Sequence, residues 1–152
     1  MRNIITAFLL IVIICNTLSS CKKNSDNIDH RTYLITNQSW TISSIRQNIN
    51  NSGWNDIFSN LPICEKDDKL FFRSGGSYNW DSGSIKCGNS DPQTYEYGTW
   101  LFSSNETKLI TTNPSGISSK ADISLLDDFN LITLNTYISG TDTTITEAKY
   151  IH

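Results

Sequence analysis

The chain has 152 residues, with 15 acidic and 12 basic side chains and a formal net charge of −3. A mildly acidic chain lacks the basic surface that nucleic acid binding requires, so we expect no nucleic acid partner. A chain of this length has enough residues for one hydrophobic core, which predicts a single folded domain.

The first 21 residues have the organisation of a secretory signal. A basic start at Arg2 precedes an apolar run over residues 4–14 that is too short to span a bilayer. The Leu-Ser-Ser-Cys sequence at residues 18–21 resembles the bacterial lipobox, which implies cleavage before Cys21 and acylation of that cysteine. We therefore expect residues 1–20 to be a lipoprotein signal peptide. We also expect the lipid to anchor the protein to a membrane of the cell envelope, the outer membrane.

Residues 21–32 form a predicted tether. They are mostly polar and nearly free of the apolar side chains that a core needs, which is typical of a flexible spacer. The folded domain is then expected over residues 33–152.

Each of the four cysteines has a predicted place or role. Cys15 falls within the signal and Cys21 is the predicted lipid site, which leaves Cys64 and Cys87 as a pair. In an oxidising compartment such a pair persists as a disulfide, so we expect a Cys64–Cys87 bond. A metal site built on these two thiols would need further ligands, and the two histidines lie at opposite ends of the predicted mature chain. We therefore expect no metal site.

After the tether, short alternating segments separated by tight turns predict about eight strands. Trp40 and Ile42 share one face of the first strand, and the turn over residues 74–76 joins the next two. Sequential hairpins favour closure into a barrel over a sandwich, because closure removes the open edges. We expect an all-β fold, an antiparallel up-and-down barrel of about eight strands, with one short helix between the first strands.

The apolar residues Trp54, Ile57, Phe58 and Leu61 recur at helical spacing, with Pro62 directly after them. This spacing predicts a short amphipathic helix at the barrel mouth, which acts either as a lid that gates the mouth or as a structural plug. On the lid hypothesis Trp54→Ala weakens ligand binding with little loss of stability.

The long strand around Gly98 changes its inward face. Tyr95 and Tyr97 are out of phase with Trp100 and Phe102, so a bulge or bend at Gly98 is expected.

In these features the chain resembles the lipocalin-like lipoproteins, small barrel domains of bacterial envelopes. The resemblance covers about residues 34–151 and is carried by Trp40, Cys64 to Asp68, Gly75 to Tyr78, Cys87 and Gly98 to Trp100. Gln38 stands where true lipocalins carry the glycine of Gly-x-Trp, and Lys149 is the only basic residue near the position of their last-strand arginine. The resemblance implies a barrel more firmly than a particular ligand site.

Aromatic side chains inside such a barrel can grip a small, partly apolar ligand, or they can fill the lumen. Trp40 is expected in the core. The candidate ligand-binding residues are Trp54, Phe58, Phe72, Tyr78, Trp80, Trp100 and Phe102.

A second hypothesis is a protein-binding barrel, either an inhibitor of a cell-wall hydrolase or an accessory of an outer-membrane complex. Its contacts would come from the exposed loops over residues 86–94 and 113–120.

The sequence offers few residues that could form a catalytic site. A serine or cysteine nucleophile needs a base, and His30 and His152 lie far apart in the sequence. The acidic cluster around Asp67 and the Asp127-Asp128 pair are interpreted as turn or capping residues. We expect no enzymatic activity and no cofactor.

Overall fold

The computed structural model describes residues 26–152. The predicted signal peptide and the predicted lipid site at Cys21 lie outside these residues. The elements, in chain order, are α2 (Asp26–Thr36), β1 (Ser39–Ile49), β2 (Trp54–Asp56), the 3₁₀ turn η1 (Phe58–Asn60), α3 (Ile63–Lys66), β3 (Lys69–Phe72), β4 (Ser77–Asp81), β5 (Thr94–Ser103), β6 (Lys108–Thr112), β7 (Ser118–Leu126), β8 (Asn130–Ser139) and β9 (Asp142–Ile151). Within these residues no helix combines the length and the apolar character needed to cross a membrane.

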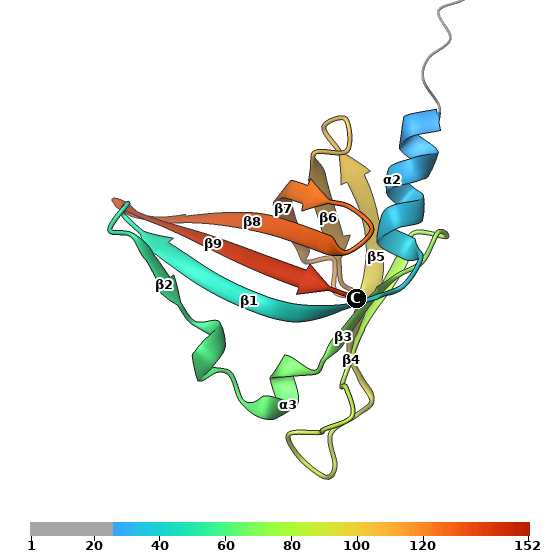
Figure 1. Ribbon diagram of the computed structural model, residues 1–152, viewed down its shortest axis with the longest axis horizontal. Coiled ribbons are helices and arrows are strands. Elements are labelled where there is room, and N and C mark those ends of the chain that lie inside the picture. Colours follow the sequence, from blue (N-terminus) through green and yellow to red (C-terminus); the bar gives the residue numbers. More distant parts are fainter. Residues whose placement is uncertain (1–25) are drawn as a thin grey trace, which may run out of the picture.

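Eight of the nine strands close into an antiparallel barrel (Figure 1). From β3 to β9 each strand pairs with the next, and β1 pairs with both β3 and β9. The ninth strand, β2, extends the sheet from the edge of β1. The predicted up-and-down barrel is confirmed, and a short helix, α3, does lie between the first strands.

Strand β1 changes its partner along its length. On one side it pairs with β3 only over Ser39–Thr41, and further along it pairs with β2 over Arg46–Asn48. On the other side it pairs with β9 from Thr41 to its last residue, Ile49. The barrel wall therefore opens between β1 and β3, and the connection over residues 57–68 spans this gap.

Helix α2 covers one end of the barrel (Figure 1). Its residues Leu34 and Ile35 are buried together with Trp40, which is completely shielded from solvent. The indole Nε1 of Trp40 donates to the backbone oxygen of Ile35 at 2.9 Å, so its one polar group is satisfied inside the core. This end of the barrel is closed by packing.

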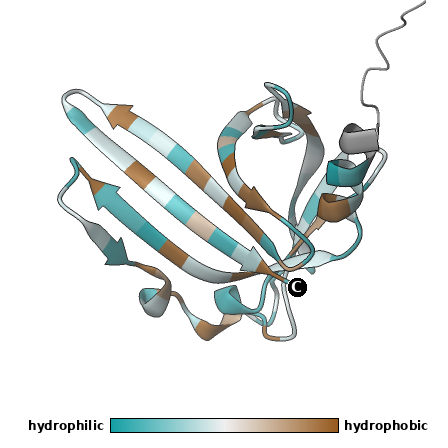
Figure 2. Ribbon diagram, turned by 45° about the horizontal axis from the view of Figure 1, so that its top comes forward, coloured by the Kyte–Doolittle hydropathy of each residue, from teal (hydrophilic) through white to brown (hydrophobic). Residues whose placement is uncertain are grey.

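Hydropathy alternates along the strands because successive side chains point to opposite faces (Figure 2). In β8, for example, Leu131 and Thr133 are buried, whereas the residues beside them are only partly so. The period of two that predicted the strands thus sorts side chains between lumen and solvent.

The helix predicted over residues 54–61 is wrong. Trp54–Asp56 form strand β2, and Asp56 Oδ1 accepts hydrogen bonds from the backbone N–H groups of Phe58 and Ser59 to make the turn η1. The free edge of β1 supplies backbone partners for this segment, and such tertiary pairing overrides a short helical pattern.

The bulge expected at Gly98 lies three residues earlier. Trp80 pairs with Glu96 and Asp81 with Thr94, so Tyr95 is the extra residue of β5. Gly98 itself has another role, because a Cβ at this position would collide with the backbone oxygen of Thr112 and touch the ring of Tyr78. Here glycine permits close approach of strands rather than a change of face.

Helix α2 begins at Asp26, inside the segment predicted as a flexible tether. The helix runs for 11 residues and ends at Thr36, within the predicted domain. Ordering of this helix follows from its contacts with β3 and β7, which the local composition does not reveal.

Candidate functional site

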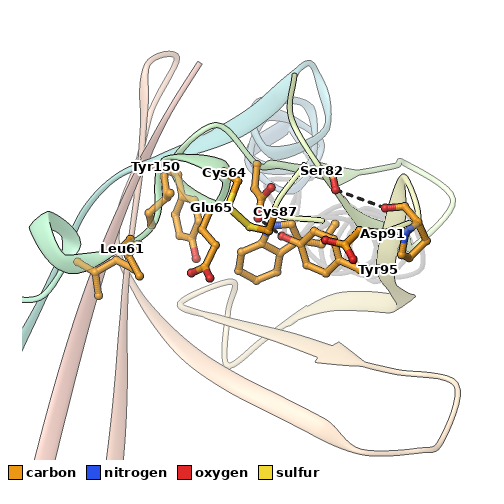
Figure 3. A pocket seen from close by; sticks show the side chains of 13 residues that line it. Leu61, Cys64, Glu65, Ser82, Cys87, Asp91, Tyr95 and Tyr150 are labelled. Atoms are coloured by element: carbon orange, nitrogen blue, oxygen red, sulfur yellow. Dashed lines mark hydrogen bonds between the residues drawn. A yellow bond between two sulfur atoms is a disulfide. The ribbon is translucent and has the colours of Figure 1, made fainter. Parts of the chain in front are cut away.

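A cavity of about 510 Å³ lies where β1 departs from β3; we call it the mouth cavity (Figure 3). Its walls come from β1, the 57–68 connection, the loop after β4, the start of β5 and the end of β9. The lining residues are Ile42, Ile45, Leu61, Cys64, Glu65, Asp68, Trp80, Ser82, Cys87, Asp91, Pro92, Tyr95 and Tyr150.

A second cavity of about 310 Å³, the lumen cavity, lies within the barrel. It shares Ile45, Trp80 and Tyr150 with the mouth cavity, so the two adjoin at these side chains. Its other lining residues are Leu70, Phe72, Tyr78, Glu96, Leu109, Thr111, Ser119, Ala121, Leu131, Thr133, Asn135, Thr146 and Ala148. Together the cavities form a mostly apolar space with a few polar groups, the usual character of a small-molecule site.

The predicted disulfide is confirmed and forms part of the mouth cavity wall (Figure 3). Cys64 in α3 is bonded to Cys87 in the loop between β4 and β5, with their Cα atoms 5.2 Å apart. The same loop is held by Asp67, whose Oδ2 accepts the backbone N–H of Ser84 at 2.6 Å. The rim of the mouth is therefore fixed by a covalent bond and by charge-assisted hydrogen bonds.

Carboxylates face both cavities. Asp68 is only 8 % exposed and accepts a hydrogen bond from the hydroxyl of Tyr95. Glu96 lines the lumen cavity, is exposed to solvent, and accepts the Tyr78 hydroxyl at 2.6 Å. Glu65, on α3, lines the mouth and is exposed.

Burial and these carboxylates raise the pKa values of tyrosines that line the cavities. Burial, together with the hydrogen bond to Glu96, raises the pKa of Tyr78 to about 12. Burial also raises the pKa of Tyr150 to about 12. The pKa of Tyr95 is raised above its usual range by burial, by its hydrogen bond to Asp68, and by the charges of Asp68, Glu65 and Glu96. These three carboxylates therefore lie around a single phenol.

Three of the seven predicted ligand-binding residues line the cavities. Phe72 and Tyr78 face the lumen cavity, and Trp80 borders both.

Trp100 and Phe102 lie instead towards the closed end of the barrel. The indole Nε1 of Trp100 donates to the backbone oxygen of Arg73 at 2.9 Å, and its ring packs edge-on against Phe102 and Phe72. Arg31 of α2 lies 5.7 Å from the centre of the Phe102 ring. Both aromatic side chains therefore belong to the packing beneath α2.

Trp54 and Phe58 line neither cavity. The Trp54 ring lies outside, 42 % exposed, with the guanidinium of Arg46 stacked 4.6 Å from its centre. The ammonium of Lys66 sits 5.1 Å from the Phe58 ring. The predicted helical gate does not form. Trp54 and Phe58 lie in β2 and η1, away from the opening, and of the four residues at helical spacing only Leu61 lines the mouth cavity.

Sequence reasoning missed several wall residues, above all Tyr95, Glu96 and Tyr150. Tyr150 could have been found, because Thr146, Ala148 and Tyr150 alternate along the last strand and all three line the lumen cavity. Tyr95 could not, since the bulge that turns it towards the mouth has no local signature.

No group of three metal-ligating side chains converges within residues 26–152. The chain matches no protein-family model, and no curated protein matches it.

Proposed function

We propose that this protein is a lipid-anchored component of the cell envelope whose barrel binds a small, partly apolar ligand. The observation that carries the proposal is the pair of adjoining cavities, about 510 and 310 Å³, in a barrel whose other end is fully packed. A chain that needed only a stable barrel would fill this space, because unfilled apolar volume costs stability.

Binding would draw its free energy from burial of ligand surface against Trp80, Tyr150 and the aliphatic wall of β1. Each Å² of apolar surface buried contributes roughly 25 cal/mol before ordering costs are subtracted. The disulfide and the Asp67 hydrogen bonds support this use, because a rim fixed in advance reduces the ordering cost.

The proposed anchor at Cys21 stands five positions before the start of α2, and α2 covers the closed end. The mouth would then open on the side away from the anchor. A ligand would reach it from the aqueous compartment rather than laterally from the bilayer.

Native mass spectrometry tests the ligand-binding proposal directly. The protein, purified gently from its own envelope fraction with the disulfide intact, is expected to carry an additional mass that is lost on denaturation. A matched preparation of Trp80→Ala is expected to carry less of it. A wild-type protein that is reproducibly free of ligand and takes up no apolar probe would refute the proposal.

The protein-binding barrel remains a second candidate, favoured by one observation. Tyr137 and Ile138, next to the tip of the β8–β9 hairpin, are 68 % and 67 % exposed. Adjacent exposed apolar side chains of this kind can mark a contact surface. Crosslinking from position 137 in envelope preparations would test it, with crosslinking from the exposed position 105 as control.

We propose no catalytic activity for the site. Its polar groups are carboxylates, tyrosines, hydroxyl side chains, the Asn135 amide and the Trp80 indole, and neither of the chain's two histidines lines either cavity. A screen with generic ester and glycoside substrates is expected to give no turnover.

A further inference from the structure

The walls of the two cavities carry negative charge without a compensating positive charge. Glu65, Asp68 and Asp91 line the mouth cavity and Glu96 lines the lumen cavity. No lysine, arginine or histidine of the described chain lines either one. None of the three ion pairs within that part of the chain involves these carboxylates.

The lysines beside these carboxylates in the sequence direct their ammonium groups to other oxygens. Lys86, next to the disulfide, donates to the backbone oxygen of Asp91 at 2.8 Å, and Lys66 donates to the backbone oxygen of Ser59 at 3.1 Å. The carboxylate of Asp91 accepts the backbone N–H of Gly88 at 2.6 Å and so serves the loop. Asp68 and Glu96 each accept a tyrosine hydroxyl, and like Glu65 they form no ion pair within the described residues, so their charge acts on the cavities.

Aromatic faces lie among these carboxylates. The rings of Trp80 and Tyr95 are 6.0 Å apart and tilted by 37°, and Tyr150 lines the same cavity. Tyr95 also contacts Asp68 through its hydroxyl. An organic cation is attracted both by aromatic faces and by carboxylates, and aromatic enclosures of this kind recognise ammonium groups.

Building on the ligand-binding function proposed above, we propose that the ligand is an amphiphilic organic cation. Its ammonium group lies in the mouth cavity against Trp80 and Tyr95, within the field of Glu65, Asp68 and Glu96. Its apolar chain extends past Tyr150 into the lumen cavity, towards Leu70, Phe72, Leu109 and Leu131.

A bare metal ion fits this site less well than an organic cation does. The carboxylates line the walls of two adjoining cavities, and no three ligating side chains meet around one point within residues 26–152. Apolar walls also leave most of the coordination shell of a hard cation without oxygen ligands.

Three probes that share an eight-carbon alkyl chain but differ in the charge of the head group test the proposal. They are octyltrimethylammonium, 1-octanol and octanoate. Binding to the full chain is followed by titration calorimetry at low ionic strength, below the micelle concentration of each probe. We expect octyltrimethylammonium to bind about tenfold more tightly than 1-octanol, and octanoate to bind most weakly.

The double variant Glu65→Gln/Glu96→Gln should remove most of the preference for the cation while 1-octanol binding is retained. The matched control Glu147→Gln removes a carboxylate on β9 that pairs with Arg46, away from both cavities, and should leave the preference unchanged. Equal affinity for all three probes, or tighter binding of octanoate, would overturn the cation proposal and leave the ligand-binding function standing. Failure of every probe to bind would overturn both.

Discussion

The two ends of the barrel use the same kind of side chain for different purposes. At the closed end the indoles of Trp40 and Trp100 each donate to a backbone oxygen and are buried beneath α2. At the open end Trp80 is only partly buried and borders two cavities. An aromatic residue in a barrel therefore says little by itself, and the space beside its ring decides whether it stabilises the fold or meets a ligand.

The largest expected effect is at the closed end. Trp40→Ala should reduce the free energy of unfolding by about 3–5 kcal/mol, because it leaves a cavity beneath α2 and an unpaired carbonyl at Ile35. Urea unfolding followed by circular dichroism measures this loss. Trp40→Phe, which keeps most of the volume, should lose markedly less. Equal losses for the two variants would contradict the packing argument.

The open end should owe much of its stability to the disulfide. The bond joins residues 23 positions apart, for which loop-closure entropy gives about 3 kcal/mol. The double variant Cys64→Ser/Cys87→Ser should therefore unfold at lower urea concentration and lose ligand affinity as the rim loosens. Wild type measured with and without a reductant provides the control. If reduction changed stability but not binding, the rim would not form part of the site.

Trp80→Ala and Trp100→Ala compare the two ends directly. The change at Trp100 should cost about 3–5 kcal/mol of stability, whereas the change at Trp80 should cost less, since that ring already borders open space. Binding of 1-octanol, referred to the folded fraction, should weaken only in Trp80→Ala. A reversal of these two patterns would place the ligand site at the other end.

The raised pKa values of the tyrosines that line the lumen cavity predict that the free energy of unfolding falls at alkaline pH. The pKa values of Tyr78 and Tyr150 are about 12 in the folded barrel, against the usual 10 in the unfolded chain. The unfolded chain loses these protons first, so stability is complete below pH 10 and falls as the pH rises towards 12. Urea midpoints measured from pH 9 to 11.5 should fall less steeply in Tyr78→Phe. An unchanged slope would exclude Tyr78 as a source of the effect.

The smallest effect is expected at Trp54, which packs outside the barrel against Arg46. Trp54→Ala should change the free energy of unfolding by about 1 kcal/mol or less and leave 1-octanol binding unaltered. The same calorimetric titration used for Trp80→Ala measures this. A clear loss of affinity would restore the gating role that the helical spacing suggested.

Strand positions and the disulfide partners could be predicted from sequence because both depend on local information. A period of two records which side chains face the lumen, and cysteine pairing follows from a count of cysteines and their predicted positions. The site was only half predictable. Phe72, Tyr78 and Trp80 lie on regular strands, so their inward direction follows from the pattern. Tyr95 reaches the mouth through a bulge, and Trp54 is removed from it by a strand pairing.

Local sequence patterns are enough to predict the antiparallel barrel, the order of its hairpins and the Cys64–Cys87 bond. They do not predict which end of the barrel is filled and which is open. That difference arises because β1 leaves β3 after three residue pairs and α2 covers the other end, and both depend on contacts between segments far apart in the chain. The negative charge of the cavities is likewise a tertiary property, since Glu65, Asp68 and Glu96 come together only when the barrel closes.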